Sequence, residues 1–328
     1  MKLKKQIASI LLVITVFAAF NFSVYQLLTR RLSNNFSGAT QAKMIDVGKY
    51  LPHEEGSELP KIDSSLKLAD NLPVLDGAAA LVPVYAAIID NVYPKGCVTY
   101  EGGKFSDDNF YGENFASDSA MQYKNTVRGY QAIVDGTTDI LFCAGPSEEQ
   151  RLYAEEKGVE LVYVPIGLEA FVFFVNEKNP VDDLTVEQIR KIYSCEYTNW
   201  KEVGGANRVI NPITRLEGSG SQTTFEAFMK DYDIGRKSVF AVTGASIGFS
   251  FRYYMDGIVE NDAVKMLSLN GVYPSAENIQ NRSYPIVAEF YAIYREDNEN
   301  ENIQILIDWL LSDEGQSLIE QTGYVRIN

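Results

Sequence analysis

Strand-like apolar runs alternate with helical patterns along the chain from residue 72 onward. In VLDGAAALVPVYAAIID, residues 74–90, an apolar run and a small-residue turn precede helical spacing, with Pro83 tolerable in the first helical turn. The segment TDILFCAGPSEEQRLYAEEKG, residues 138–158, repeats this order. There, Ser147 and Gln150 form a predicted capping box, and Gly158 is the expected end of the helix. This alternation predicts an α/β fold.

Two longer apolar stretches, residues 162–176 and 283–294, are rich in β-branched and aromatic residues. They are predicted to be buried strands. Between them, NPVDDLTVEQIRKIY predicts a helix that begins with a second capping box, Thr185 and Gln188. No repeat of the solenoid type is present. We therefore expect two α/β lobes connected by the two long strands.

The amino terminus predicts a membrane anchor or signal sequence over residues 1–31. Lysine-rich MKLKKQ precedes an apolar run at residues 7–20, which extends to residue 28 before two arginines. The extended run is long enough to cross a bilayer, and no clear cleavage site follows it. We favour an uncleaved anchor whose lysines face the cytoplasm. The rest of the chain is then expected on the extracytoplasmic side, at the cell surface or secreted.

The chain length suits about two domains. Polar residues 32–70 are expected to form a tether between the membrane and the folded body. The predicted boundaries are residues 71–165 plus 286–328 for lobe I and residues 166–285 for lobe II.

The net charge of the chain limits the kinds of molecule that it is expected to bind. The formal net charge of −15 argues against binding to nucleic acid or, through a soluble face, to an anionic membrane surface. It does not exclude a small anionic ligand, because charges beyond about 8 Å are screened.

The histidine and cysteine content argues against most enzyme chemistry. His53 is the single histidine, so a His-based triad or a histidine-rich metal site is not available. Its polar, Pro-containing surroundings predict a solvated loop residue. Cys97, Cys143 and Cys195 are far apart in the sequence and are interpreted as buried free thiols. We expect neither an enzyme nor a cofactor or metal site.

The segment TRLEGSGSQTTFEAFM, residues 214–229, is the main candidate for chemistry. It lacks the lysine of a phosphate-binding nucleotide loop, the third glycine of a dinucleotide fingerprint and the GxSxG pattern of a nucleophile elbow. Two interpretations remain open. In the first, the amides of a helix beginning near Ser221 bind an anion together with Arg215, Ser219 and Gly220. In the second, Ser221 only caps the helix, and Arg215 pairs with Glu217 or Asp231.

The wider sequence resembles the phosphate-binding proteins of ABC importers. The resemblance covers residues 72–328 and is carried by an ordered block over residues 179–229. The shared motifs are Asn-Pro-Val at 179–181, Leu-Thr at 184–185, Asn199-Trp200, Val203-Gly204-Gly205, Arg215 and Gly218-Ser219-Gly220, together with DGAAALVPVYAA, SIGFSFRYY and the ending LLSDEGQSLIEQTGYVRIN. The resemblance implies a two-lobed periplasmic-binding-protein type II fold, with the ligand enclosed between the lobes by hinge closure.

The resemblance also implies a set of ligand-binding residues. Arg215, Ser219, Gly220 and Ser221 match the second-lobe cluster, with Ser221 in place of a common threonine. In the first lobe, Ala79 and Ala80 would contribute backbone N–H groups, and Asn125 or Thr126 would contribute a polar side chain, with Arg128 as a possible extra cation.

Two positions depart from the family pattern. Ala79 replaces a usual hydroxyl residue, and Ala144 replaces an aspartate that accepts the proton of hydrogen phosphate. Glu148 or Glu149 could substitute for the missing carboxylate, although exposed positions at a helix start are the simpler interpretation.

These features predict an extracellular solute-binding protein that delivers phosphate or a related oxyanion to an ABC permease. The alternative is a membrane-anchored ligand sensor or interaction module of the same fold with a different ligand. An enzyme is the third and most distant hypothesis, since the sequence offers no convincing nucleophile and base.

Overall fold

The computed structural model describes residues 45–105, 111–215, 217–235, 245–255 and 263–327. Residues 44–328 form one compact unit. The predicted anchor or signal sequence at residues 1–31 lies outside the described residues. Within the part of the chain that the structure describes, no helix is long and apolar enough to cross a membrane.

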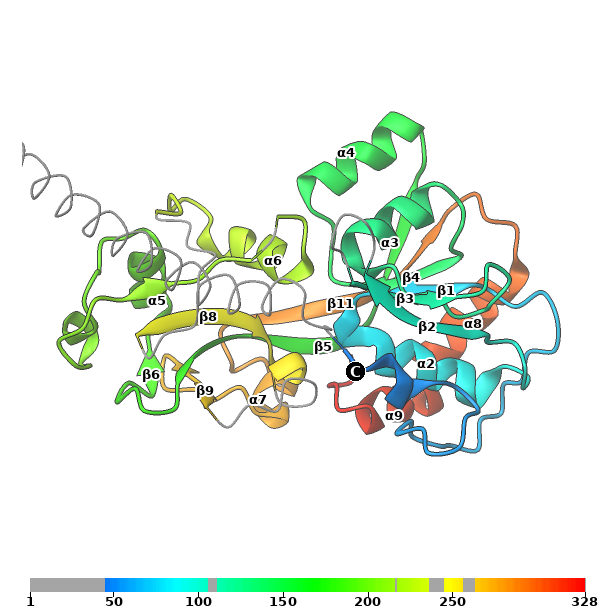
Figure 1. Ribbon diagram of the computed structural model, residues 1–328, viewed down its shortest axis with the longest axis horizontal. Helices are drawn as coiled ribbons and strands as arrows, with labels where there is room; N and C mark the ends of the chain where they lie inside the picture. The colour runs from blue at the N-terminus through cyan, green and yellow to red at the C-terminus, as the bar shows by residue number, and fades with distance from the viewer. Residues whose placement is uncertain (1–44, 106–110, 216, 236–244, 256–262, 328) are drawn as a thin grey trace, which may run out of the picture. The chain divides into compact units, whose positions relative to one another are not determined.

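Strands and helices alternate over the first part of the fold, as the apolar pattern predicts (Figure 1). The predicted capping boxes at Ser147–Gln150 and Thr185–Gln188 are both present, and Gly158 ends its helix in the left-handed conformation. Up to residue 193 the elements are η1 (Val47–Tyr50), β1 (Leu75–Gly77), η2 (Ala79–Leu81), α2 (Val82–Val92), β2 (Tyr100–Phe105), β3 (Tyr111–Phe115), α3 (Asn125–Val134), β4 (Ile140–Cys143), α4 (Glu148–Lys157), β5 (Leu161–Asn176), β6 (Asp183–Leu184) and α5 (Val186–Tyr193).

The main sheet has the strand order β1-β4-β11-β5-β8-β7, with β9 also paired to β5. Residues 161–170 of β5 pair with β11, whereas residues 171–175 pair with β8. Because β5 has different partners along its length, it connects the two parts of the sheet. The later elements are η3 (Trp200–Val203), β7 (Asn211–Pro212), α6 (Gly220–Met229), β8 (Ser246–Phe251), β9 (Val264–Met266), β10 (Ser268–Leu269), α7 (Ala276–Gln280), β11 (Val287–Arg295), α8 (Glu301–Leu311) and α9 (Asp313–Gln321).

Alternate side chains of β4 point to opposite faces of the sheet and pack into two different cores. Ile140 and Phe142 belong to the first core, which contains residues of α2, α8 and α9. Leu141 and Cys143 belong to the third core, which contains residues of α3 and α4. This arrangement follows from the two-residue period of a strand, and Figure 1 shows α3 and α4 on the opposite side of β4 from α2 and α9.

A second core lies on the other part of the sheet. It contains Phe171 and Phe173 of β5, Phe249 of β8 and Phe225 of α6, whose ring stacks on Phe249 at a centroid distance of 4.2 Å. We name the part around the first and third cores lobe I, and the part around the second core lobe II. The predicted α/β fold with two lobes and two long connecting strands is thus observed, while the residue boundaries of the lobes remain a prediction.

Residues 45–70, the described part of the predicted tether, are packed against the folded protein, so the prediction of a tether is wrong for them. Their apolar side chains pack into the first core, because the polar sequence carries isolated apolar residues that α2 and its neighbours cover. The buried members are Ile45, Val47, Tyr50, Leu59 and Leu68.

The interpretation of His53 as a solvated residue is wrong. Its imidazole is 13% exposed, and its Nδ1 lies 3.5 Å from Oδ1 of Asp90, a carboxylate at the end of α2. Oδ1 of Asp90 also accepts a hydrogen bond from the His53 backbone, and Oδ2 accepts one from Lys61. Burial lowers the pKa of His53, and the Asp90 carboxylate opposes this shift.

The three cysteines are free thiols, as expected, but not all of them are buried. Cys143 is buried in the third core, Cys97 is half-buried and Cys195 is exposed. The expectation of buried packing is therefore wrong for Cys195, which lies in a left-handed position just after α5.

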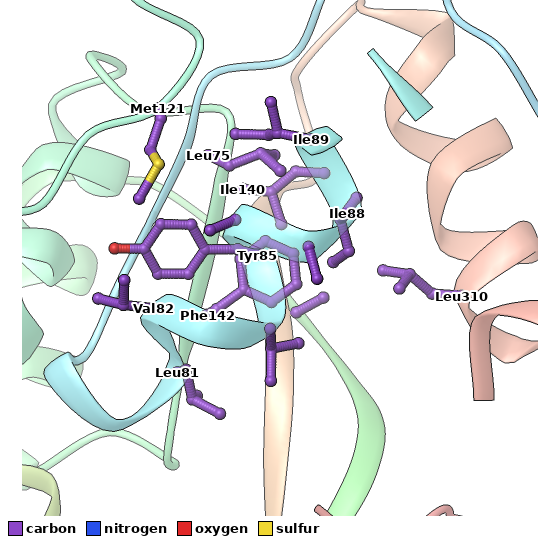
Figure 2. Packing of buried hydrophobic residues seen from close by; sticks show 14 of the residues in the cluster. Leu75, Leu81, Val82, Tyr85, Ile88, Ile89, Met121, Ile140, Phe142 and Leu310 are labelled. Carbon is purple, nitrogen blue, oxygen red and sulfur yellow. The ribbon is translucent and has the colours of Figure 1, made fainter. Parts of the chain in front are cut away.

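The first core leaves no room for a side chain at Gly77, where β1 ends. A Cβ atom at this position would lie 2.6 Å from the carbonyl oxygen of Phe142 and 2.8 Å from a ring carbon of Tyr85. Figure 2 shows the Tyr85 ring in the middle of this core, beside Phe142 and Met121. Because residue 77 has no side chain, β4 and α2 can pack closely against the end of β1.

Gly77→Ala should lower the free energy of unfolding by about 1–3 kcal/mol, because the added methyl group meets backbone as well as a packed ring. Gly112→Ala in β3 is the matched control, since a Cβ there has no neighbour within 4 Å. The control should change stability by less than about 0.5 kcal/mol. Chemical denaturation of both variants measures this, and equal effects would contradict the close packing at Gly77.

The lowered pKa of His53 predicts a pH dependence of stability. The folded protein binds the imidazole proton more weakly than the unfolded chain, so the neutral imidazole contributes stability above a pH of about 6.5. That contribution should be lost as the pH falls through the lowered pKa of the folded state.

An NMR titration of the single imidazole should give a pKa below the ordinary value for histidine. His53→Asn, in which asparagine tolerates the positive φ of 64°, should remove this part of the stability change between pH 7.5 and 5.5. An identical pH dependence in the variant and the wild type would contradict the assignment.

Candidate functional site

One cavity, with a volume of about 80 Å³, brings the predicted binding residues together. All of the residues predicted to bind ligand except the extra cation Arg128 line it, as does Ala144. Their common position supports a shared role, which remains a proposal. The lining residues are Ala78, Ala79, Ala80, Leu81, Asn125, Thr126, Ala144, Glu169, Arg215, Ser219, Gly220, Ser221, Ser250, Phe251, Tyr254, Glu289, Phe290 and Tyr324.

The start of α6 forms the lobe II wall of the cavity. The helix begins at Gly220, and its N-cap is Ser219, whose Oγ accepts a hydrogen bond of 3.3 Å from the backbone of Gln222. Ser221 is therefore inside the first turn and is not the cap. The N–H groups of Gly220 and Ser221 have no acceptor within the helix, and the helix dipole makes this end attractive to an anion.

Arg215 adds a positive charge to the same wall. Its guanidinium carbon lies 6.0 Å from the ring centroid of Tyr254, and its backbone N–H donates to Oε1 of Gln222 at 2.9 Å. Burial raises the pKa of Tyr254, and the charge of Arg215 opposes this shift. Among the described residues, neither Glu217 nor Asp231 forms an ion pair with Arg215. Arg215 lines the cavity together with Tyr254.

The turn after β1 forms one part of the lobe I wall. Ala79 and Ala80 begin η2, so their N–H groups have no acceptor within that helix. The carbonyl of Ala80 accepts a hydrogen bond of 2.5 Å from the hydroxyl of Tyr324. Ala79 is 3% exposed and has no hydroxyl, so only backbone donors are available at this position.

The start of α3 forms the other part of this wall. Thr126 is buried, and Asn125 adopts a left-handed conformation in which its Oδ1 accepts from the N–H of Thr126 at 2.7 Å. Tyr130, one turn further along, donates its hydroxyl hydrogen to the carbonyl of Ala144 at 2.9 Å. This contact fixes the end of β4 against α3.

Asp76 holds the two parts of the lobe I wall together. Its Oδ1 accepts the N–H groups of Gly77 and Lys124, each at 2.8 Å. Its Oδ2 accepts from the ammonium of Lys124 at 3.1 Å and from the hydroxyl of Thr138 at 3.3 Å. Burial raises the pKa of this carboxyl group, and Lys124 opposes the shift. The residues after Gly77 and after Lys124 are those that reach the cavity.

The two walls approach each other closely at Gly220. A Cβ atom there would lie 3.4 Å from Cβ of Ala144 and 4.0 Å from Oγ1 of Thr126. The departure at Ala144 therefore places a methyl group beside the start of α6, at the position where the resemblance implies a carboxylate.

Two carboxylates at the cavity, Glu169 and Glu289, were missed by the sequence analysis. Glu169 on β5 accepts from the backbone of Ala170 at 2.8 Å and of Tyr253 at 3.0 Å, and lies 3.5 Å from Arg252. Glu289 on β11 accepts from the hydroxyl of Tyr291 at 3.1 Å. A charged residue within a long apolar strand was the signal that could have identified them. The lining aromatic residues Phe251, Tyr254, Phe290 and Tyr324 carried no such signal.

The remaining expected groups do not reach the cavity. Arg128 is exposed and is not part of the lining. Glu148 is on the surface and pairs with Arg151, and Glu149 is also exposed, so the simpler interpretation of these carboxylates is supported. The described residues contain no cluster of histidine, cysteine or carboxylate side chains that could hold a metal ion.

Solved structures with this fold include two transport proteins. A putative phosphate ABC transporter substrate-binding protein with bound phosphate from Clostridium perfringens superposes with a TM-score of 0.57 at 22% identity, covering 80% of this chain and all of that protein. An ABC-type phosphate transport receptor from Vibrio cholerae gives 0.52 at 19% identity, covering 76% and 98%. At these identities the similarity shows the fold, and it confirms the expected two-lobed periplasmic-binding-protein type.

Sequence comparison identifies relatives over most of the chain. The phosphate-binding protein PstS of Bacillus subtilis is 28% identical over 237 residues, which are 67% of this chain and 75% of that protein. Protein SphX of Synechococcus elongatus is 26% identical over 291 residues, or 77% and 86%. The model of the PBP superfamily domain matches residues 108–314. The chain therefore belongs to the PBP superfamily.

Proposed function

We propose that this protein is a solute-binding protein that captures phosphate or a related tetrahedral oxyanion in the cavity between its lobes. The observation that supports this most strongly is the convergence of Arg215 and the start of α6 with the amides of η2 and the side chain of Thr126 on one cavity. An arginine and helix-start amides provide charge and directed donors, which are what an oxyanion requires.

The size of the cavity suits a small ion. A volume of about 80 Å³ has room for a few water-sized groups. Hydrogen bonds to an anion become stronger as the surroundings become less polar than water. The PstS relative from Bacillus subtilis is named a phosphate-binding protein, which favours phosphate over other oxyanions.

The proposed role includes transfer of the anion to an ABC permease on the extracytoplasmic side of the membrane. Binding without chemistry is the simplest use of this site, since the cavity offers donors and two carboxylates that are already hydrogen-bonded. The relatives that support this role are described as binding and transport proteins and not as enzymes.

Ala144 bears on selectivity between oxyanions. An ionised carboxylate beside a bound anion favours a ligand that carries a proton and repels a fully ionised one. Since position 144 supplies a methyl group, we infer that this site does not use that position to select hydrogen phosphate over sulfate.

Arg215→Ala should weaken phosphate binding at least tenfold, because a charge-assisted bidentate contact is lost from the site. Arg208→Ala removes an exposed arginine of lobe II and is the matched control, expected to leave the affinity unchanged. Isothermal titration of both variants and the wild type measures the effect, and thermal unfolding checks that the fold is retained. Equal affinities in all three proteins would reject Arg215 as a ligand contact, and absence of wild-type binding would reject phosphate as the ligand.

Ala144→Asp should raise the preference for phosphate over sulfate at least tenfold, chiefly by weakening sulfate binding. Phosphate binding should also become weaker as the pH rises and the anion loses its proton. Ala144→Asn has the same size without the charge, so it controls for crowding against Gly220. Competition titrations of the two anions test this, and identical selectivity in both variants would contradict the role given to position 144.

A further inference from the structure

Gln150 connects α4 of lobe I to the loop that precedes α6 in lobe II. Its Nε2 donates a hydrogen bond of 3.1 Å to the carbonyl oxygen of Gly218, the residue before the N-cap of α6. Gln150 is 8% exposed, so this contact is largely shielded from water. We propose that Gln150 is a positioning residue that holds the anion-binding loop of lobe II against lobe I and so sets the affinity for the ligand. This inference rests on the proposed function for its ligand.

The side-chain amide of Gln150 takes part in two different contacts. Its Oε1 accepts the N–H of Ser147 at 2.9 Å, and its own N–H donates to Oγ of Ser147 at 3.3 Å, which completes the capping box of α4. The capping box needs only the oxygen of the amide group. The NH₂ group remains, and it makes the contact with Gly218. Glutamate at this position would complete the same box without offering this donor.

The two ends of the contact belong to separate packing units. Ala154 of α4 is part of the third core, with β4 and β11, whereas Phe225 of α6 is part of the second core. A hydrogen bond between them therefore forms only when the loop before α6 meets the start of α4. Gly218 also packs near this site, since a Cβ there would lie 3.3 Å from Cγ2 of Val127 on α3.

The contact also fixes the orientation of a peptide unit in the binding loop. The C=O and N–H groups of one planar trans peptide point in opposite directions. When the carbonyl of Gly218 is held toward Gln150, the N–H of Ser219 is turned away from Gln150. The positive φ of Gly218, 73°, is a conformation that glycine adopts without strain, so this peptide unit would otherwise have freedom to reorient.

A second capping box in the same protein provides a close control. Gln188 accepts from the N–H of Thr185 at 2.8 Å and donates its backbone N–H to Thr185 Oγ1 at 3.1 Å, as Gln150 does with Ser147. Among the described residues, the Gln188 amide nitrogen has no partner in the other lobe. The same substitution at the two positions therefore changes the same local structure but only one contact between lobes.

The experiment compares four variants of the full chain with the wild type: Gln150→Glu, Gln188→Glu, Gln150→Ala and Gln188→Ala. The glutamate pair retains both capping boxes, and the alanine pair keeps the net charge constant. Phosphate affinity and dissociation rate are measured for each, at low and high salt. Hydrogen exchange of the segment 217–225 is followed with and without phosphate.

Both Gln150 variants should bind phosphate about three- to tenfold more weakly than their Gln188 counterparts, as expected for the loss of one hydrogen bond. Most of the change should be in the dissociation rate. The difference in the alanine pair should persist at high salt, which screens through-space charge effects. Hydrogen exchange over residues 217–225 should be faster in the Gln150 variants.

Two results would overturn the inference: equal affinities within each pair, or a loss of affinity confined to Gln150→Glu and removed by salt. The latter would show an effect of added charge alone. If the wild type binds no phosphate, the proposed ligand is wrong, and hydrogen exchange decides the question of positioning. Faster exchange at 217–225 in both Gln150 variants then supports the contact, and unchanged exchange contradicts it.

Discussion

The antiparallel pairing of β5 with β11 is the interaction on which the rest of the structure depends. The two strands pair from Leu161 with Arg295 to Ala170 with Val287, and β5 then continues into lobe II as the partner of β8. A shift in register occurs between Phe290 and Tyr291, so the pairing is irregular beside the cavity, which Phe290 lines. Since both lobes are built on these strands, their pairing determines which loops can meet.

The chemistry of the site follows from where the helices begin. The start of α6 and the 3₁₀ turn before α2 present backbone donors to one cavity, the start of α3 adds the side chains of Asn125 and Thr126, and Arg215 adds the formal positive charge. A protein with a net charge of −15 can bind an anion in this way because the donors are local and the distant charges are screened. The buried carboxylate of Asp76 stabilises two of these segments without reaching the ligand space. Anion recognition and an acidic surface are thus compatible.

Local signals in the sequence were sufficient for many of the elements. Capping boxes and an apolar period each act over a few residues, so they predicted the starts of α4 and α5. The proposed binding residues, by contrast, were chosen from the family resemblance, and the structure places them around one cavity. The helix begins at Gly220, close to the predicted start near Ser221, but the alternative in which Ser221 is the N-cap is wrong. Ser219 and Ser221 are both suitable caps, and the choice depends on the preceding left-handed Gly218. Local pattern could not decide between them.

The features that were wrong or missed depend on contacts between distant segments. The His53 side chain is half-buried beside Asp90, 37 residues away, which accepts the His53 backbone N–H, and residues 45–70 pack on α2 through isolated apolar side chains. Glu169 and Glu289 reach the cavity only because two remote strands pair. The contact of Gln150 with Gly218 spans 68 positions and leaves no trace in the local capping pattern. Tertiary packing fixes all of these.

The central claim is that an oxyanion binds where Arg215, the start of α6 and the lobe I wall converge. Anomalous diffraction from crystals grown with arsenate, a tetrahedral analogue of phosphate, tests it most directly. The account predicts one arsenic peak within hydrogen-bonding distance of the Arg215 guanidinium and the N–H groups of Gly220 and Ser221, with Thr126 on its opposite side. An arsenic peak elsewhere on the protein, with none in this cavity, would contradict the account.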